Sequence, residues 1–301
     1  MNLPSPVTLA TPAFVLLVIG EMLYARATAK AHFEARDTAT SLMMGLGSTV
    51  SGAIFAFIYV AYAGLVAQYA VFDLGYSLAA FIACFVIDDF YYYWWHRISH
   101  RVRWFWADHV QHHSSQHYNL STALRQPWTG VLTPSLLLRT PMFLLGFPLP
   151  MLAFVHGLNL VYQFWIHTEA IGKMPRWFET VMNTPSHHRV HHATNARYLD
   201  SNYAGVFIVW DRMFGTFVRE DETDPPRYGI VKNLGTFNPV KVALHEWVGI
   251  AADLIRARSI RDAFLYLMAP PGWSPDGSRQ TSDSIKAEWK RHQATQLVAG
   301  E

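Results

Sequence analysis

The chain has 301 residues, of which 51% are hydrophobic, 15% aromatic and only 15% charged. Soluble domains carry about 25% charged residues, so this composition predicts a membrane-embedded protein. The formal net charge of +2 gives no reason to expect a nucleic-acid partner. A single cysteine, Cys84, excludes an intrachain disulfide and a cysteine metal cluster, so nitrogen and oxygen ligands must hold any metal.

Three apolar segments in the first third of the chain are predicted to cross the membrane. Residues 7 to 25 are interrupted only by Glu21, and residues 38 to 72 carry no charge. Each is long enough for a ~30 Å hydrocarbon core, which takes ~20 helical residues. The third segment starts near residue 74 and meets Asp88 and Asp89. No basic residue precedes the first segment, so we expect an uncleaved anchor rather than a signal peptide.

Basic residues predict which side of the membrane the ends of these segments face. Arg26, Lys30 and Arg36 follow the first segment, whereas the turn around Asp73 has no lysine or arginine. The positive-inside rule therefore places the first loop in the cytoplasm. The third segment then runs inward, and its aromatic end at residues 91–95 reaches the cytoplasmic boundary.

Residues 127–167 are predicted to form a membrane hairpin, because they are apolar and have three prolines near their middle. Arg139 lies inside it, where a charge is costly unless it pairs, snorkels or contacts a lipid headgroup.

Thr184 is expected to cap a helix that begins at Ser186. Apolar residues at helical spacing over 239–256 are typical of a core helix or of one resting on the bilayer. From Gly272 onward we expect an irregular tail.

Histidines occur at helical spacing in two parts of the chain. Residues three or four apart share a helix face, and neutral imidazole is the commonest metal ligand at neutral pH. These converging rings are too many for one tetrahedral zinc, so the sequence predicts a site for two metals. The candidate ligands are His96, His100, His109, His112, His113, His187, His188, His191 and His192.

His167 is a further candidate ligand. It ends the hairpin at the depth of the two clusters, and Gln163 lies one helical turn before it. The remaining histidines, which are isolated, are given structural roles.

The expected chemistry is oxidative. A nitrogen-rich site at a membrane face suits iron, and ferrous sites with open positions activate oxygen. Two irons with O2 could oxidise an unactivated carbon of a lipid that enters sideways from the bilayer. The apolar hairpin would then exclude water from the reaction.

Several motifs together resemble the fatty acid hydroxylase and sterol desaturase superfamily, and within it the alkylglycerol monooxygenases and their bacterial relatives. The motifs are HRISH, HVQHHSSQHYNLSTALRQ, YQFWIHTE, NTPSHHRVHH and NYAGVFIVWDRMFGTF, over about residues 80–218. The resemblance implies a membrane diiron oxygenase with the histidines above as ligands. It also implies hydroxylation of the ether-bearing carbon of a glyceryl ether, with tetrahydropterin as the reductant.

Four residues are assigned supporting roles at the metals. Asp89, which matches the family motif, is expected to hydrogen-bond a ligand imidazole from behind. Gln163 is placed beside His167. By the resemblance, Asn202 and Asp211 would buttress the helix of the last cluster, although a turn or capping role suits them equally well.

The predicted fold is an all-α, multi-pass membrane bundle with a cytoplasmic-face helical cap that carries the dimetal site. Residues 1–95 would form the anchor, 96–218 the catalytic region and 219–301 amphipathic helices with a loose tail. A bacterial inner membrane is favoured over the endoplasmic reticulum. The alternatives are a hydroxylase or desaturase of another lipid, a bis-histidine haem electron carrier, and a metal transporter. Neither the haem electron carrier nor the metal transporter explains the spacing His-x2-His-His, which occurs at residues 109–113 and again at residues 188–192.

Overall fold

Helices are the main regular secondary structure in the described parts of the chain. The structure is a computed structural model that describes residues 3–28 and 30–299. Over these residues it has thirteen α-helices, two short 3-10 helices and no β-strand beyond two isolated bridges. The all-α class predicted from the sequence is confirmed.

The first two helices are the candidate membrane spans. α1 (Pro6–Thr28) and α2 (Ala35–Ala67) are the two described helices that are long and apolar enough to cross a bilayer. Their aliphatic side chains point outward, including Leu16 and Leu46. α2 begins earlier than the uncharged segment, because the Glu34 side chain accepts a hydrogen bond from the backbone N–H of Asp37 and caps the helix.

α3 (Leu78–Arg101) is a single helix that runs from the third apolar segment through the aromatic run to His100. Its polar second half keeps it from qualifying as a span by composition. At Val102 the backbone is extended (φ −124°, ψ 117°), and α4 (Arg103–His113) follows immediately. This break lets α4 fold back against the end of α3.

The expected hairpin has two unequal limbs. Its first limb is broken into short pieces, which are η2 (Gly130–Leu132), α5 (Ser135–Leu138) and α6 (Thr140–Leu145); η1 (Thr122–Leu124) precedes them. Gly146 then turns the chain with φ +87°, at a place where a Cβ atom would lie 1.7 Å from the Phe72 carbonyl oxygen. The second limb is one helix, α7 (Leu149–Trp165), which packs between α1 and α3.

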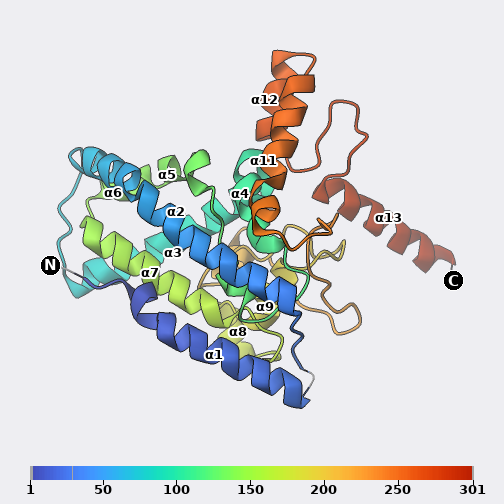
Figure 1. Cartoon of the computed structure of the whole chain (residues 1–301), viewed down its shortest axis with the longest axis horizontal. Coiled ribbons are helices and arrows are strands. Elements are labelled where there is room, and N and C mark those ends of the chain that lie inside the picture. The colour runs from blue at the N-terminus through green and yellow to red at the C-terminus, as the bar shows by residue number, and fades with distance from the viewer. Residues whose placement is uncertain (1–2, 29, 300–301) are drawn as a thin grey trace.

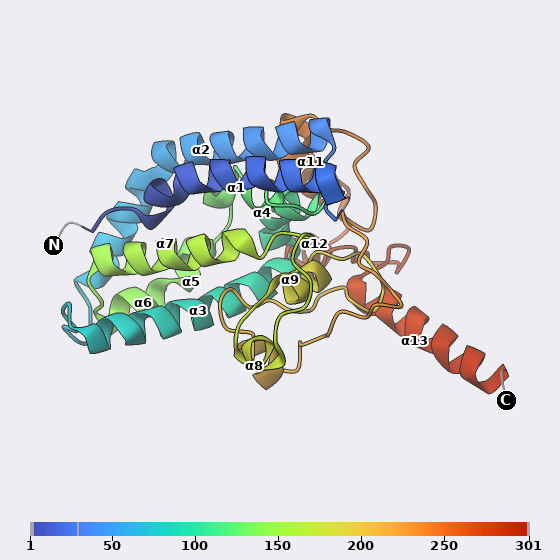
Figure 2. The same ribbon diagram turned by 90° about the horizontal axis from the view of Figure 1, so that it is seen from below.

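A cap of shorter helices lies at the end of the bundle where α3 and α7 terminate (Figures 1 and 2). It contains α8 (Arg176–Val181), α9 (Pro185–His191) and α10 (Val209–Met213). α11 (Pro239–Arg256) and α12 (Ile260–Met268) form a hairpin that packs on α4.

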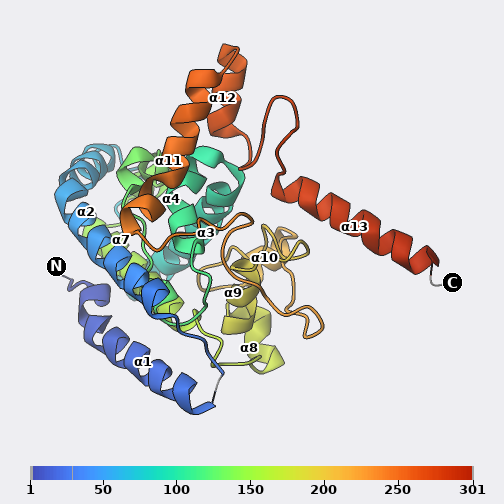
Figure 3. The same ribbon diagram turned by 45° about the vertical axis from the view of Figure 1, so that its right-hand side comes forward.

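One expectation for this region holds in part and another is wrong. Thr184 is the N-cap residue of α9, as predicted, and the helix begins at Pro185, one residue before Ser186. Its hydroxyl, however, donates to the Glu179 carboxylate at 3.3 Å and makes no capping bond. The tail expected to be irregular from Gly272 onward contains α13 (Ser282–Ala299), which extends away from the bundle (Figure 3). An ion pair between Arg101 and Asp283 ties the start of this helix to the end of α3.

Candidate metal centre

Buried histidines converge where α3, α4, α9 and the end of α7 meet. They form two groups, in each of which every residue offers one ring nitrogen within 4.8 Å of the others. The first cluster is His96, His100, His109, His113 and His191, and the second cluster is His112, His167, His188 and His192. The structure thus brings together segments that are up to 95 positions apart in the sequence, because residues 96 and 191 share one cluster.

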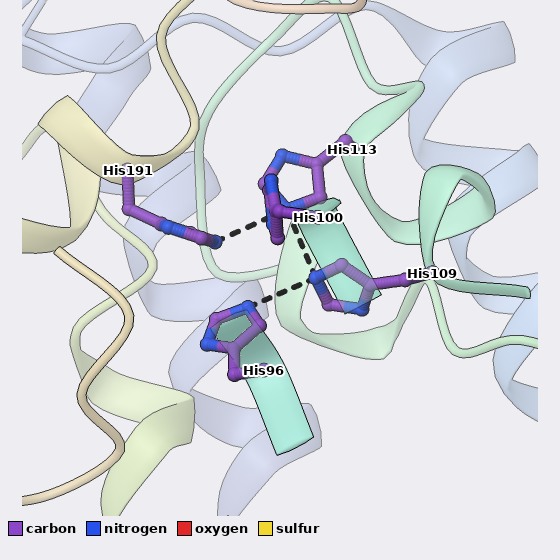
Figure 4. A group of neighbouring side chains, drawn as sticks. All are labelled: His96, His100, His109, His113 and His191. Carbon is purple, nitrogen blue, oxygen red and sulfur yellow. Dashed lines mark hydrogen bonds between the residues drawn. The ribbon is translucent and has the colours of Figure 1, made fainter. Parts of the chain in front are cut away.

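Helical spacing accounts for the first cluster (Figure 4). His96 and His100 lie one turn apart on α3, and His109 and His113 lie one turn apart on α4. The Nε2 atoms of His96 and His109 are 2.9 Å apart. The Nε2 atom of His113 lies 3.1 Å from that of His109 and 3.1 Å from that of His191, which comes from α9.

The second cluster uses the neighbouring face of the same helices. His112 of α4 and His188 of α9 both point toward His167, which follows the end of α7. The Nε2 atom of His167 lies 3.2 Å from that of His112 and 3.0 Å from that of His188. The rings of His113 and His192 stack with centroids 4.3 Å apart, so the two clusters are in direct contact.

The protonation of these rings suits metal binding. Burial lowers the pKa of His112 to about 4, so the ring is neutral at pH 7 and carries one proton. That proton is on Nδ1, because Nδ1 donates to the Arg125 carbonyl oxygen at 3.2 Å. His167 is likewise neutral, since burial and the nearby His112 lower its pKa, and its Nδ1 donates to the Gln163 carbonyl at 2.7 Å. Both Nε2 atoms therefore present lone pairs.

Two lone pairs that face each other across 3.2 Å repel unless a cation lies between or beside them. The first cluster has the same character, because Nδ1 of His96 donates to the Tyr203 carbonyl at 2.7 Å and Nδ1 of His191 donates to the Ser201 carbonyl at 3.0 Å. The Nε2 atoms of His100 and His192 are buried and have no hydrogen-bond partner within the described chain. The donor set therefore fits two metal ions held by nitrogen.

A short loop after α9 orients the first cluster, and the sequence reasoning found only one of its residues. Asp200 contacts Nδ1 of His100 at 3.5 Å, Ser201 accepts from His191, and Tyr203 accepts from His96. Asp200 and Asn202 both have left-handed backbone, at φ 49° and 57°. Non-glycine residues rarely adopt this conformation, and Asp and Asn tolerate it best. The Asp and Asn in the sequence LDSNY could therefore have indicated this loop.

Asn202 and Asp211 hold this loop in place. The Asn202 amide donates to the carbonyl of His187 in α9 at 3.0 Å. Asp211 accepts from the backbone N–H groups of Tyr203 and Ala204, both at 2.8 Å. Burial raises the pKa of Asp211 to about 6, against the lowering effect of these hydrogen bonds.

The expected role of Asp89 is wrong. Its carboxylate contacts no imidazole but accepts four hydrogen bonds, from the backbone N–H groups of Val206 and Phe207, from Trp210 Nε1 and from Asn159 Nδ2, at 2.8–2.9 Å. Asp89 therefore fixes the segment after the orienting loop to α3. Its partners lie more than 60 positions away in the sequence, which is why its position one to two turns before His96 was misleading.

The side chains of three other predicted residues do not contact the proposed ligands. His187 belongs to neither cluster, and its Nε2 lies 3.9 Å from Glu179. The Gln163 side chain donates to Asn159, so its backbone carbonyl alone supports His167. Arg139 joins a buried group away from the clusters, 2.8 Å from His156 Nδ1 and 3.6 Å from Asp88.

Arg125, which the sequence did not single out, is fully buried and links α2 to the second cluster. Its guanidinium pairs with Asp37 at the start of α2 and also donates to Ser41 and Ser114. Its carbonyl accepts the Nδ1 proton of His112. The single residue thus fixes the position of one ligand relative to a candidate span.

The comparisons with known proteins agree with the motifs. The family model described as "Fatty acid hydroxylase" matches residues 81–216, which carry every histidine of both clusters. The chain is 38% identical over 282 residues to alkylglycerol monooxygenase of Homo sapiens and 39% identical over 282 residues to that of Xenopus tropicalis. These alignments cover 92% of this chain and 62% of each relative.

A bacterial relative is more distant. Ornithine lipid hydroxylase OlsE of Rhizobium tropici is 27% identical over 142 residues, which are 47% of this chain and 41% of that protein. No solved structure matches the chain.

Proposed function

We propose that the chain is a member of the fatty acid hydroxylase family, whose model matches residues 81–216, and that it is a membrane monooxygenase that hydroxylates a lipid with two irons and O2. The observation that carries the proposal is the pair of buried imidazole clusters, within each of which Nε2 atoms face one another at 2.9–3.2 Å. When bound, the two irons would supply the reductive activation of O2 and the oxidation of an unactivated C–H bond.

The proposed ligands are the nine histidines of the two clusters, without His187. Four of these rings donate their Nδ1 protons to backbone carbonyl oxygens, which belong to Arg125, Gln163, Ser201 and Tyr203. These bonds keep the Nε2 atoms of the four rings turned inward. Fixing the tautomer in this way raises ligand basicity. Burial of all nine rings keeps water away from the reacting centre.

The proposed substrate is a glyceryl ether. The similarity to two alkylglycerol monooxygenases over 92% of this chain supports this choice. Hydroxylation of the ether-bearing carbon gives a hemiacetal, which breaks down to an aldehyde and a free glycerol hydroxyl. One oxygen atom of O2 enters the lipid and the other leaves as water, so the reaction needs two electrons, for which tetrahydropterin is the proposed donor. Another lipid is the second candidate, because the chain also resembles an ornithine lipid hydroxylase.

We place the clusters on the cytoplasmic side, because Arg26, Lys30 and Arg36 lie at the end of α1 and the start of α2. The clusters lie at this end of the two helices, since Arg125 joins Asp37 of α2 to His112. A bacterial inner membrane is the proposed location. A bis-histidine haem is a weaker reading of the site, since it needs two facing rings with a flat slot between them. Here four or five rings pack together, with many centroids 4.3–5.1 Å apart.

The first test is the iron content of anaerobically purified protein, for the parent, His188→Ala and His187→Ala. These two adjacent residues lie on the same short helix, but only His188 belongs to a cluster. We expect about two irons per parent chain, retention in His187→Ala and loss in His188→Ala. Equal iron in the two variants, or a parent that binds haem or no transition metal, would refute the dimetal centre.

The second test is turnover of a panel of alkylglycerols, ornithine lipids, fatty acyl lipids and sterols with O2 and tetrahydropterin. Aldehyde formed only from the alkylglycerols supports the proposed substrate. A hydroxylated product from another lipid alone would overturn the substrate while leaving the iron site intact.

A further inference from the structure

The helix α11 turns its two acidic side chains toward the protein and several aliphatic side chains outward. Its protein-facing side carries Glu246 and Asp253, which pair with Arg103 at 2.6 and 2.7 Å. Asp253 also pairs with Arg279 at 2.6 Å. The two acidic groups of this helix are therefore turned inward and matched by arginines from α4 and the C-terminal region.

The outward side of α11 is aliphatic. Val240, Leu244, Val248 and Ile255 are 53%, 42%, 65% and 85% exposed. Their spacing of four, four and seven residues places them along one helix face. A soluble helix would turn this stripe inward, so its outward position indicates an apolar environment outside the protein.

The second helix of the hairpin repeats the pattern, and its tip is basic. Ile260 and Phe264 of α12 are 92% and 59% exposed. Arg256, Arg258 and Arg261 lie at or beside the turn between the helices, are exposed, and form no ion pair with any described residue. Large apolar side chains beside unpaired arginines match a bilayer surface that carries anionic headgroups.

The position of the hairpin fits the same surface. α11 begins beside α2, where the Thr40 hydroxyl donates to the Phe237 carbonyl at 2.7 Å and Met44 packs against Val242. The neighbouring Leu46 of α2 is outward and apolar, so the exposed stripe starts next to the outer surface of a candidate span. Figures 1 and 2 show that α11 and α12 run across the direction of α1 and α2, and therefore along the plane of a bilayer that those helices cross.

We propose that the α11–α12 hairpin lies on the bilayer, with its aliphatic stripe at the boundary between headgroups and acyl chains and its arginines on anionic headgroups. The hairpin also packs on α4, which carries three ligands. It would therefore fix the height of the metal centre relative to the membrane surface, independently of which lipid is oxidised.

Site-specific quenching by nitroxide lipids tests this position. Cys84 is the only cysteine and is buried, so a Cys84→Ala background allows single fluorophores to be attached. The test positions are Val248→Cys and Phe264→Cys, and Ile54→Cys, which is 58% exposed further along α2, is the deep lipid-exposed control. Ala287→Cys is the water-exposed control, because it is exposed on α13 among charged residues.

The full-length protein is reconstituted into phosphatidylcholine vesicles with nitroxides at shallow or deep acyl positions. We expect shallow nitroxides to quench positions 248 and 264 several-fold more than position 287, and deep nitroxides to quench position 54. Quenching at 248 and 264 equal to that at 287 would overturn the proposal. So would cysteine cross-links between copies through position 248, because a second chain would then cover the stripe.

The arginines are tested with the same fluorophore at position 264. Adding phosphatidylglycerol should increase shallow quenching in the parent, and this increase should disappear when Arg256, Arg258 and Arg261 are all replaced by glutamine. An increase that survives in the triple variant would exclude these arginines as the headgroup contact. Iron content and thermal unfolding of each labelled protein verify that the fold is retained.

Discussion

Replacing Asp200 by asparagine tests whether the loop after α9 tunes the first cluster. Asparagine keeps the shape of the side chain and tolerates the left-handed backbone at this position, so the loop geometry should survive. Burial alone would raise the pKa of Asp200, but His100 and Arg101 lower it below its ordinary value, so the carboxylate is ionised at pH 7. The substitution therefore removes one negative charge from behind His100.

The expected loss can be bounded from the contacts. Removing a carboxylate that supports a metal-ligating histidine typically weakens metal binding 10–100-fold. The Asp200 contact is long, at 3.5 Å, and the carboxylate is shared with Arg101 at 3.1 Å. We therefore expect the lower end, about tenfold or about 1.4 kcal/mol.

The assay is chelator competition, followed by the iron retained per chain. Asp283→Asn is the matched control, because Asp283 also pairs with Arg101 but contacts no histidine. Asp200→Asn should release one iron at about one-tenth of the chelator concentration that the parent needs, whereas the control should match the parent. If both variants match the parent, or both lose iron equally, the charge behind His100 is not what tunes the site.

Three further predictions address the fold around the site. Arg125→Gln should lower the unfolding free energy by about 3–5 kcal/mol, because it leaves the buried Asp37 unpaired; unchanged thermal unfolding would contradict this. In metal-free protein, the folded pKa of His112 is about 4 and lies below its ordinary value of 6.5, so the unfolded chain binds more protons between these values. Stability is then fully present above about pH 6.5 and falls by roughly 3 kcal/mol toward pH 4, which pH-dependent unfolding measures; a flat profile would argue against a neutral ring. Asp89→Asn should cost about 2–3 kcal/mol, because an amide cannot accept all four hydrogen bonds of the carboxylate, and iron retention should fall with it; wild-type unfolding and iron content would exclude this bracing role.

Local spacing was enough to predict which histidines come together, although not how they divide into the two clusters. An α-helix repeats every 3.6 residues, so pairs such as His96 and His100 share a face whatever the rest of the chain does. The same locality explains why α1, α2 and the start of α9 were anticipated. It also explains one excess, since His187 lies at ligand spacing from His191 but faces Glu179.

The residues that orient the histidines could not be predicted from local spacing. Asp200, Ser201 and Tyr203 contact histidines that are up to 107 positions away, and Asp89 contacts a segment up to 121 positions away. Such pairings depend on how helices pack, which neither motif spacing nor composition specifies.

The sequence by itself determined the helical class, the apolar segments long enough to cross a membrane and the histidines at ligand spacing, because composition and helical periodicity are properties of short segments. Only the tertiary structure decided which rings form each cluster, which carbonyls hold their protons, and that α11 turns its two acidic side chains inward. Buried charges and polar atoms must find partners, and those partners lie on segments that only the completed fold brings together.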